Sequence, residues 1–526
     1  MSNHRPRNVF GILAAALLGL VTACVAPTSP PAPKTNVTVA PIFGDHAVLQ
    51  AGMPVPVWGT AAAGDSISVA FGGRTVRTVA SGDGKWSVSL DALAATSVPG
   101  DLVVTGQTAV TLHDVVVGEV WLCSGQSNME FTVDDGGPVY RVENAAAELA
   151  TAHYPLIRQF KVERAVAMAP IAQVTTEGWK LATPETVAHF TAVGYFFARD
   201  IHRAVGVPVG IILTSWGGTP IESWMSDAAR NSTSLAATLD VRWKKAMSEW
   251  PPDRVARYPG DMKAWQKAEA DAHTAHTKNL LPWPQPPATN DSPALPGGLF
   301  NAMIAPLQPY AIRGVLWYQG EANVGRASEY AELLMTMIRS WRAGWAEGDF
   351  PFDIVQLANF SSEGQEQNRD WAMLREAQSK ALALPETGMA VTIDIGSAHN
   401  IHPPNKQEVG RRLALIANSQ VYHVAPDPSG PVFENATREG SAMRVRFLHT
   451  DGELVEREGP IKAMEIAGAD QVFHPAGVDI DTDTLLVSSP EVSDPVAVRY
   501  AWTNAPVANL YNEMGLPAAP FRSDAW

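Results

Sequence analysis

The sequence contains very little cysteine. Only Cys24 and Cys123 occur among its 526 residues. Cys24 ends an N-terminal segment that resembles a lipidation site, so Cys123 is left without a partner and no disulfide is expected. Cys123 follows an apolar run, and we interpret it as a buried small hydrophobic residue and not as a reactive thiol.

Positive charge is also scarce. The chain has 39 Lys and Arg against 54 Asp and Glu, for a formal charge of −15. Nucleic acids and anionic membrane surfaces are bound by basic surfaces, so neither is expected as a partner. The same balance disfavours a polyanionic substrate.

Long apolar runs are missing except near the N-terminus. Arg5 and Arg7 precede the apolar run 9–21, which is too short to span a bilayer stably. This pattern predicts a signal peptide over residues 1–24. Residues 21–24, Val-Thr-Ala-Cys, resemble a bacterial lipobox, which implies cleavage before Cys24 and lipidation of its thiol; the alternative is a plain signal peptide. We therefore expect an exported bacterial lipoprotein, periplasmic or at the cell surface, that touches the membrane only through this anchor.

Patterning divides the remainder into a tether and three regions. Residues 25–37 are rich in Pro and Ser and predict an extended tether. Short alternating segments cut by Gly and Asp predict an N-terminal β-sandwich over 38–113 and a second β region with the tail over 426–526. Between them, 114–425 alternates apolar strands with amphipathic helices, which predicts an α/β domain. A segment at about 226–296, rich in Trp, Lys and Pro, predicts a helical insertion into that domain.

The central region predicts a parallel sheet covered by helices on both faces. Strand-like runs occupy 115–123, 207–215, 312–318, 352–360 and 389–396, and helical runs occupy 191–205, 327–345, 369–384 and 405–421. In open sheets of this kind, ligands bind beyond the carboxyl ends of the strands. We therefore look for chemistry in the residues that follow each strand.

Four strand ends carry polar or glycine-rich residues. They comprise Gly125, Gln126, Ser127 and Asn128 after the first strand, Trp216, Gly217 and Gly218 after the second, Gln319, Glu321 and Asn323 after the third, and Asp394 and His402 after the fifth. These groups suit acyl transfer. A serine needs a base to take its proton, and a histidine suits that task at neutral pH. The Gly218 N–H, the Asn323 side chain and the Ser127 N–H then predict donors for an oxyanion.

Together these stretches resemble a family. The segments GQSNM, GGTPIESW, YQGEAN and IHPPNKQEVGRRLA resemble the motif blocks of the sialate O-acetylesterase-like branch of the SGNH (GDSL-type) hydrolases. The stretches at 41–59 and 498–524 resemble the N-terminal β domain and C-terminal tail of that family. The resemblance implies an SGNH-type parallel sheet with accessory β regions, Ser127 as nucleophile, His402 as general base, and Gly218 and Asn323 in the oxyanion hole. It implies no metal and no cofactor.

The third member of a catalytic triad is not evident. SGNH enzymes commonly place an Asp three residues before the histidine, where this chain has His399. The acid is then Asp394, which we favour, or Glu321, or no acid at all, with Asn400 or a backbone carbonyl holding the His402 tautomer. A zinc site built from His399, His402 and Asp394 is a further alternative, although the spacing matches no zinc signature.

The predicted activity is removal of acetyl groups from glycans. The resemblance implies acetylated sialic acid or acetylated plant polysaccharides such as xylan or xyloglucan, and the negative charge favours the neutral polysaccharide. Gln126, Gln319, Glu321 and Trp216 are the candidate substrate-binding residues, Trp216 because sugar faces pack on aromatic rings. The alternatives are an SGNH lipase or thioesterase and a non-catalytic glycan-binding surface lipoprotein. The oligomeric state is left open.

Overall fold

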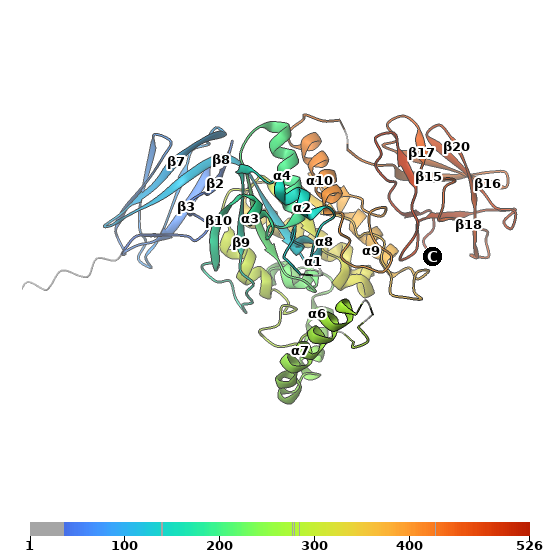
Figure 1. The fold of residues 1–526 in the computed structure, drawn as a ribbon, viewed down its shortest axis with the longest axis horizontal. Helices are drawn as coiled ribbons and strands as arrows, with labels where there is room; N and C mark the ends of the chain where they lie inside the picture. The colour runs from blue at the N-terminus through green and yellow to red at the C-terminus, as the bar shows by residue number, and fades with distance from the viewer. Residues whose placement is uncertain (1–35, 138–139, 276, 278, 283, 427) are drawn as a thin grey trace, which may run out of the picture.

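The computed structural model describes residues 36–526 except 138–139, 276, 278, 283 and 427. The expected signal peptide, Cys24 and the tether up to residue 35 lie outside the described residues. A central α/β region lies between two β-rich regions, and a pair of helices projects from one side (Figure 1). Within the described part of the chain, no helix combines the length and the apolar character needed to cross a membrane.

The central sheet contains six parallel strands and one antiparallel edge strand. In spatial order they are β10 (Thr176–Ala182, antiparallel), β9 (Tyr154–Val162), β11 (Val209–Ser215), β8 (Ala109–Gly125), β12 (Gly314–Tyr318), β13 (Phe352–Val355) and β14 (Thr387–Ala390). The register pairs Gly125 with both Ser215 and Tyr318, so β8, β11 and β12 end side by side. The residues that follow these three strands therefore meet at one edge of the sheet.

Helices cover both faces of this sheet. Trp317 of β12 packs on Trp341 of α8, whereas the ring of the next residue, Tyr318, lies beneath the Lys406 ammonium at the start of α10. Because consecutive strand residues point to opposite faces, α8 and α10 lie on opposite sides. The helices are α1 (Ser127–Glu130), α2 (Ala145–Ala150), α3 (Pro184–Val187), α4 (Ala192–Val205), α5 (Asp227–Asn231), α8 (Ala327–Trp345), α9 (Asp370–Ser379) and α10 (Lys406–Gln420).

Shorter helical turns complete the central region. These are η1 (Ile221–Trp224), η2 (Phe300–Ile304), η3 (Ala305–Leu307), η4 (Glu321–Arg326) and η5 (Lys380–Ala383). The projecting pair consists of α6 (Ala236–Ser248) and α7 (Pro252–Thr274) (Figure 1). It lies within the segment 226–296.

Strand β8 belongs to two sheets at once. Its first half pairs with β7 and β2 of the N-terminal region, and its second half pairs with β11 and β12. The residues on either side of the boundary predicted between the N-terminal β region (38–113) and the α/β region (114–425) therefore lie within one continuous strand. The other N-terminal strands are β1 (Thr38–Val39), β2 (Val48–Gln50), β3 (Val55–Thr60), β4 (Ser66–Phe71), β5 (Arg74–Val79), β6 (Lys85–Leu90) and β7 (Thr96–Thr105).

The C-terminal region has its own apolar core, made mainly of strand residues from β16, β18, β21 and β22. Its strands are β15 (Val432–Glu439), β16 (Ala442–Leu448), β17 (Leu454–Glu456), β18 (Met464–Ala467), β19 (Phe473–Pro475), β20 (Gly477–Asp481), β21 (Thr484–Ser488), β22 (Ala497–Tyr500), β23 (Leu510–Asn512) and β24 (Phe521–Arg522). Arg375 of α9, fully buried, donates to the carbonyls of Thr503 and Asn504 and so ties this region to the sheet.

Candidate active site

A tight turn at the end of β8 presents Ser127. Gly125 has φ +138°, and a Cβ at this position would lie 2.1 Å from the carbonyl oxygen of Tyr318. Only glycine fits there, so the chain leaves β8 pressed against β12. The Gln126 N–H donates to the same Tyr318 carbonyl, at 3.0 Å, and Ser127 then begins α1.

The structure brings Ser127 and His402 together. His402 Nε2 lies 2.8 Å from Ser127 Oγ, although the two residues are 275 positions apart in the sequence. His402 belongs to the loop between β14 and α10, where its N–H donates to Asn400 Oδ1 at 2.9 Å. Burial lowers the pKa of His402 to about 4, with a smaller contribution from the positive charge of Lys406. The imidazole is therefore neutral at neutral pH and able to accept a proton.

The prediction that Asp394 orients His402 is wrong. Both carboxylate oxygens of Asp394 accept from Arg412 of α10, at 2.6 and 2.8 Å, and Tyr511 donates to one of them at 3.3 Å. A bidentate guanidinium pair of this kind holds the carboxylate in place. The other two candidates are also engaged, since Asn400 accepts from the His402 backbone and Glu321 accepts from Asn128. Among the described residues, no carboxylate contacts the His402 ring.

The same contacts leave no zinc site at His402. Its Nε2 faces the Ser127 hydroxyl, and Asp394 is occupied by Arg412. Over the described ranges, no group of three or more His, Cys, Asp or Glu side chains is arranged to hold a metal.

The loop after β11 lies against Ser127. A Cβ on Gly217 would lie 3.2 Å from the Cβ of Ser127, so this close approach favours glycine. The next residue, Gly218, has φ +74° and is exposed, and its N–H has no acceptor among the described groups. Gly218 thus has a free donor beside the serine turn, where its role as an oxyanion donor stays a prediction.

Asn323 lies in η4 with its amide fixed. Its Oδ1 accepts from the Ile221 N–H at 3.0 Å and from Gln319 Nε2 at 2.8 Å. The NH2 group must therefore point the other way, where one of its two protons is donated to Glu222 Oε2 at 3.1 Å. The second proton of Asn323 Nδ2 has no acceptor among the described residues. The role of Asn323, which is 1% exposed, as an oxyanion donor stays a prediction.

Two of the candidate substrate-binding residues are occupied internally. Gln319 is fully buried, and its amide group contacts Gln126, the Thr219 carbonyl, Asn323 and Tyr330. Glu321 has one carboxylate oxygen on Asn128 and the other buried. The Gln319 side chain is therefore not free for a sugar. Glu321 Oε2 has no partner among the described residues and Glu321 lines a pocket with Asn400 and Pro403, so a role in substrate binding stays a prediction for Glu321.

The other two candidates are less fully engaged, although Gln126 is itself buried. Gln126 uses its Oε1 to accept from Gln319 and from the Ala322 N–H, both at 3.2 Å, which leaves its NH2 group without a partner among the described residues. Trp216 is half-buried, with the Arg164 guanidinium 5.6 Å from its ring centroid. A role in substrate binding stays a prediction for both residues.

The polar residues around Ser127 each anchor a different loop. Gln126 holds the loop after β12, Asn128 holds the loop that carries His402, and Glu130 Oε2 accepts from the Gly217 N–H at 3.0 Å. Sequence reasoning missed the roles of Asn128 and Glu130. The available signal was three polar residues alternating through a stretch that follows a buried strand.

Comparisons with known proteins agree with this geometry. Residues 117–282 and 294–418 match the family described as carbohydrate esterase, sialic acid-specific acetylesterase. The chain belongs to this family. The protein is an esterase of the SGNH type that acts on acetylated carbohydrate.

Individual relatives of this acetylesterase cover nearly the whole chain. The sialate O-acetylesterase of Rattus norvegicus is 30% identical over 518 residues, which is 88% of this chain and 90% of the relative. The human sialate O-acetylesterase is 27% identical over 524 residues, and this match covers 88% of each chain. A carbohydrate acetylesterase from Xanthomonas citri is 38% identical in sequence, and its crystal structure superposes on this chain with a TM-score of 0.78. The match covers 93% of this chain and 100% of the other.

Proposed function

We propose that the acetylesterase acts through a covalent acetyl-enzyme on Ser127, with His402 as the proton carrier. The 2.8 Å contact between His402 Nε2 and Ser127 Oγ carries this proposal. Ser127 Oγ attacks the acetyl carbonyl carbon while its proton passes to His402 Nε2. The tetrahedral intermediate collapses when the bond to the sugar oxygen breaks, and that oxygen takes the proton from His402. A water molecule then attacks the acetyl-enzyme and loses its proton to His402, and acetate leaves as Ser127 regains its hydrogen.

Three donors support the oxyanion step. The N–H groups of Ser127 and Gly218 have no acceptor among the described residues, and Asn323 keeps one free amide proton. Losing a single donor of an oxyanion hole costs about 10²–10³ in rate. We assign the oxyanion hole to these three residues.

We assign a Ser–His dyad as the catalytic pair. The neighbouring carboxylates of Asp394 and Glu321 are held by Arg412 and Asn128, and the His402 loop is held by its own backbone contacts. Tyr140 packs edge-on against the imidazole, with ring centroids 5.4 Å apart and planes at 86°. Packing and loop geometry then orient the ring in place of an acid.

We propose a neutral acetylated plant polysaccharide, such as xyloglucan or xylan, as the substrate. A sialate carboxylate would need an unpaired cation near Ser127. Arg164 is already paired with Glu130, with its Nε at 2.9 Å from the carboxylate, and Lys406 is fully buried. The formal charge of −15 adds to this preference. Trp216 and Tyr140 supply ring surfaces for a sugar face.

The expected export and lipid anchor complete the proposal. A protein that deacetylates a polysaccharide must meet it outside the cytoplasm, and the basic start, the apolar run and Cys24 fit a lipoprotein signal. Labelling of the expressed protein with radioactive palmitate tests this. We expect incorporation in the wild type and none in Cys24→Ala, and equal labelling of both would contradict the anchor.

Acetate release tests the activity. Purified wild type and Ser127→Ala are incubated with acetylated xyloglucan, acetylated xylan and O-acetylated sialic acid, and acetate is measured enzymatically. We expect release from the neutral glycans by the wild type and a loss of at least 10³-fold in Ser127→Ala. Undiminished release by Ser127→Ala would refute the serine mechanism, and exclusive release from sialic acid would refute the substrate class. Hydrolysis of long-chain esters instead would identify a lipase.

A further inference from the structure

A buried polar cluster lies directly behind the catalytic pair. It consists of Asn128, Glu321 and Lys406, and we call it the amide cluster. Asn128 follows the nucleophile in the chain, and Lys406 comes four residues after the histidine. Asn128 is 2% exposed and Lys406 is fully buried. None of the three touches the Ser127 hydroxyl, so the reaction as written gives them no task.

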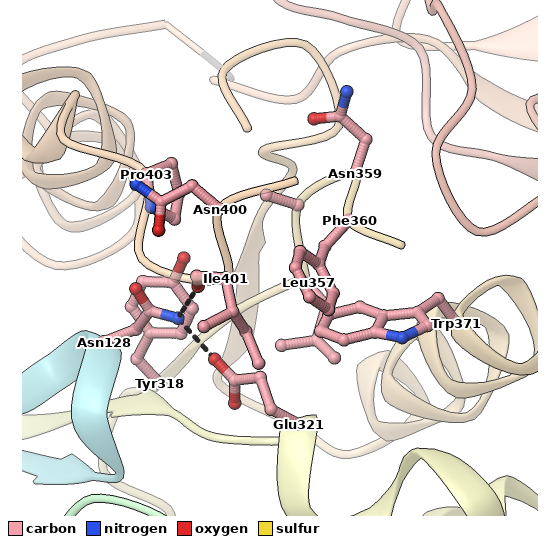
Figure 2. Close-up of a pocket in the computed structure, with 11 residues that line it drawn as sticks. Asn128, Tyr318, Glu321, Leu357, Asn359, Phe360, Trp371, Asn400, Ile401 and Pro403 are labelled. Atoms are coloured by element: carbon pink, nitrogen blue, oxygen red, sulfur yellow. Dashed lines mark hydrogen bonds between the residues drawn. The ribbon is translucent and has the colours of Figure 1, made fainter. Parts of the chain in front are cut away.

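Asn128 joins the serine turn to the histidine loop. Its Nδ2 donates to the Ile401 carbonyl at 3.0 Å and to Glu321 Oε1 at 2.5 Å. Figure 2 shows both bonds, which run from the Asn128 amide nitrogen to the Ile401 carbonyl and to the Glu321 carboxylate. Because Ile401 precedes His402, this one amide links the neighbours of both catalytic residues.

Lys406 fixes the orientation of that amide. Its ammonium donates to Asn128 Oδ1 at 2.5 Å. An ammonium only donates, and a backbone carbonyl and a carboxylate only accept, so a flipped amide would lose all three contacts. The rings of Phe131 and Tyr318 face the ammonium at 4.8 and 5.2 Å from their centroids, which helps to hold a cation at this buried place.

Burying this cation is costly. A buried ammonium loses its hydration, which is why burial lowers the pKa of Lys406 to about 7. Burial also raises the pKa of Glu321. A hydrophobic residue at position 406 would avoid the desolvation cost, so stability alone does not account for this cation.

We propose that Lys406 is a positioning residue, which acts through the side-chain amide of Asn128 to hold the His402 loop in register with Ser127. The inference rests on the proposed function, since it assigns the cluster to the same reaction. It gives the amide cluster the orienting task that a triad acid performs elsewhere, because no carboxylate among the described residues contacts His402. Asn128 transmits the effect, and Glu321 receives the second amide proton.

The test compares Lys406→Met with a matched surface variant, Lys380→Met. Lys380 lies at the start of η5, is largely exposed and pairs only loosely with Glu376 at 3.9 Å. We expect kcat for p-nitrophenyl acetate to fall about 10- to 100-fold in Lys406→Met with KM nearly unchanged, as for a misplaced catalytic group. Lys380→Met should match the wild type. Wild-type kcat in folded Lys406→Met would overturn the proposal.

A pH profile separates positioning from mere packing. The groups around the His402 ring are Ser127 from α1, Tyr140, and Lys406 from α10, with Glu321 of η4 behind Lys406 and the Glu130–Arg164 pair near Tyr140. Removing the Lys406 charge should move the acid limb of kcat/KM to higher pH. If the acid limb of kcat/KM stayed at the same pH and only Tm fell, Lys406 would have a structural role and the inference would be refuted.

Two further variants keep the test valid if Lys406→Met does not fold. Lys406→Met/Glu321→Gln removes both buried charges together and should show the same loss of kcat. Asn128→Ala should also show it, and adding Lys406→Met to Asn128→Ala should cost little more, because residues that act as one unit are not additive. Fully additive losses would overturn the proposal.

A fluorophosphonate probe distinguishes this inference from the proposed function. In labelling, a bond forms from Ser127 Oγ to phosphorus, the P–F bond breaks, fluoride leaves, and the serine proton passes to His402. If the wild type labels rapidly but releases no acetate from any ester, the acetylesterase mechanism fails while the inference is still tested by labelling rates. We expect Lys406→Met to label at least 10-fold more slowly than the wild type and Lys380→Met, and equal rates would overturn the inference.

Discussion

The acid limit of activity is predicted to lie far below that of an ordinary histidine. His402 must be neutral to take the Ser127 proton, and burial together with Lys406 lowers its pKa to about 4. At pH 5 an imidazole with this pKa is about 90% neutral, whereas one with the ordinary value of 6.5 is about 3% neutral. The environment of His402 therefore predicts about 30-fold more of the neutral base at pH 5 than an exposed histidine would supply.

The assay is kcat/KM for acetate release between pH 3.5 and 8, since this ratio reports the ionisation of the free enzyme. We expect a plateau that begins at about pH 5 and a fall below it with a midpoint near pH 4. Preincubation at each pH followed by assay at pH 7 separates titration from unfolding. A reversible midpoint near 6.5 would refute the reasoning, because it would mean that the ring is solvated and not packed as described.

Two further predictions concern carboxylates away from the reaction. Asp394→Asn should leave kcat near the wild-type value but lower the unfolding free energy by about 3 kcal/mol, because it breaks the buried pair with Arg412. Initial rates measure kcat, and urea unfolding measures the free energy. A loss of kcat above 10-fold would restore Asp394 to the triad. Asp353 of β13 is fully buried, and burial raises its pKa from 3.8 to about 8. Its native state holds a proton that the unfolded chain releases, so it lowers stability progressively from about pH 4 to pH 8, by about 4 kcal/mol at pH 7. Asp353→Asn should remove this part of the pH dependence in urea titrations, and parallel curves for variant and wild type would contradict it.

The reacting residues could be predicted from the sequence because ligands bind beyond the carboxyl ends of the strands in an open parallel sheet. Ser127, Gly218 and Asn323 follow β8, β11 and β12, whose register aligns their ends. Strands β9 and β10 were missed. Strand β9 contains Pro155, Arg158 and Lys161, and Arg158 is buried only because Asp114 and backbone carbonyls receive its guanidinium. The hydrophobic pattern of the sequence does not show that a charged residue is buried when its partner lies far away in the chain.

The contacts of the polar residues were less predictable for a related reason. Asp394 lies at the right strand end for a triad acid, but Arg412, 18 residues further on, takes both of its oxygens. Gln319 also follows a strand, yet its side chain turns inward to Tyr330 and Asn323. Position along the chain indicates the edge of the sheet, whereas competition among partners decides which way each side chain faces.

The course of β8 through two sheets has a consequence for how the chain can be divided. Because β8 pairs in both sheets, the N-terminal strands are joined to the serine turn through one strand, with Asp114 at φ +55° and an irregular register where the two pairings meet. Expression of the central region cut at residue 114 would divide this strand and expose its inner edge to self-association.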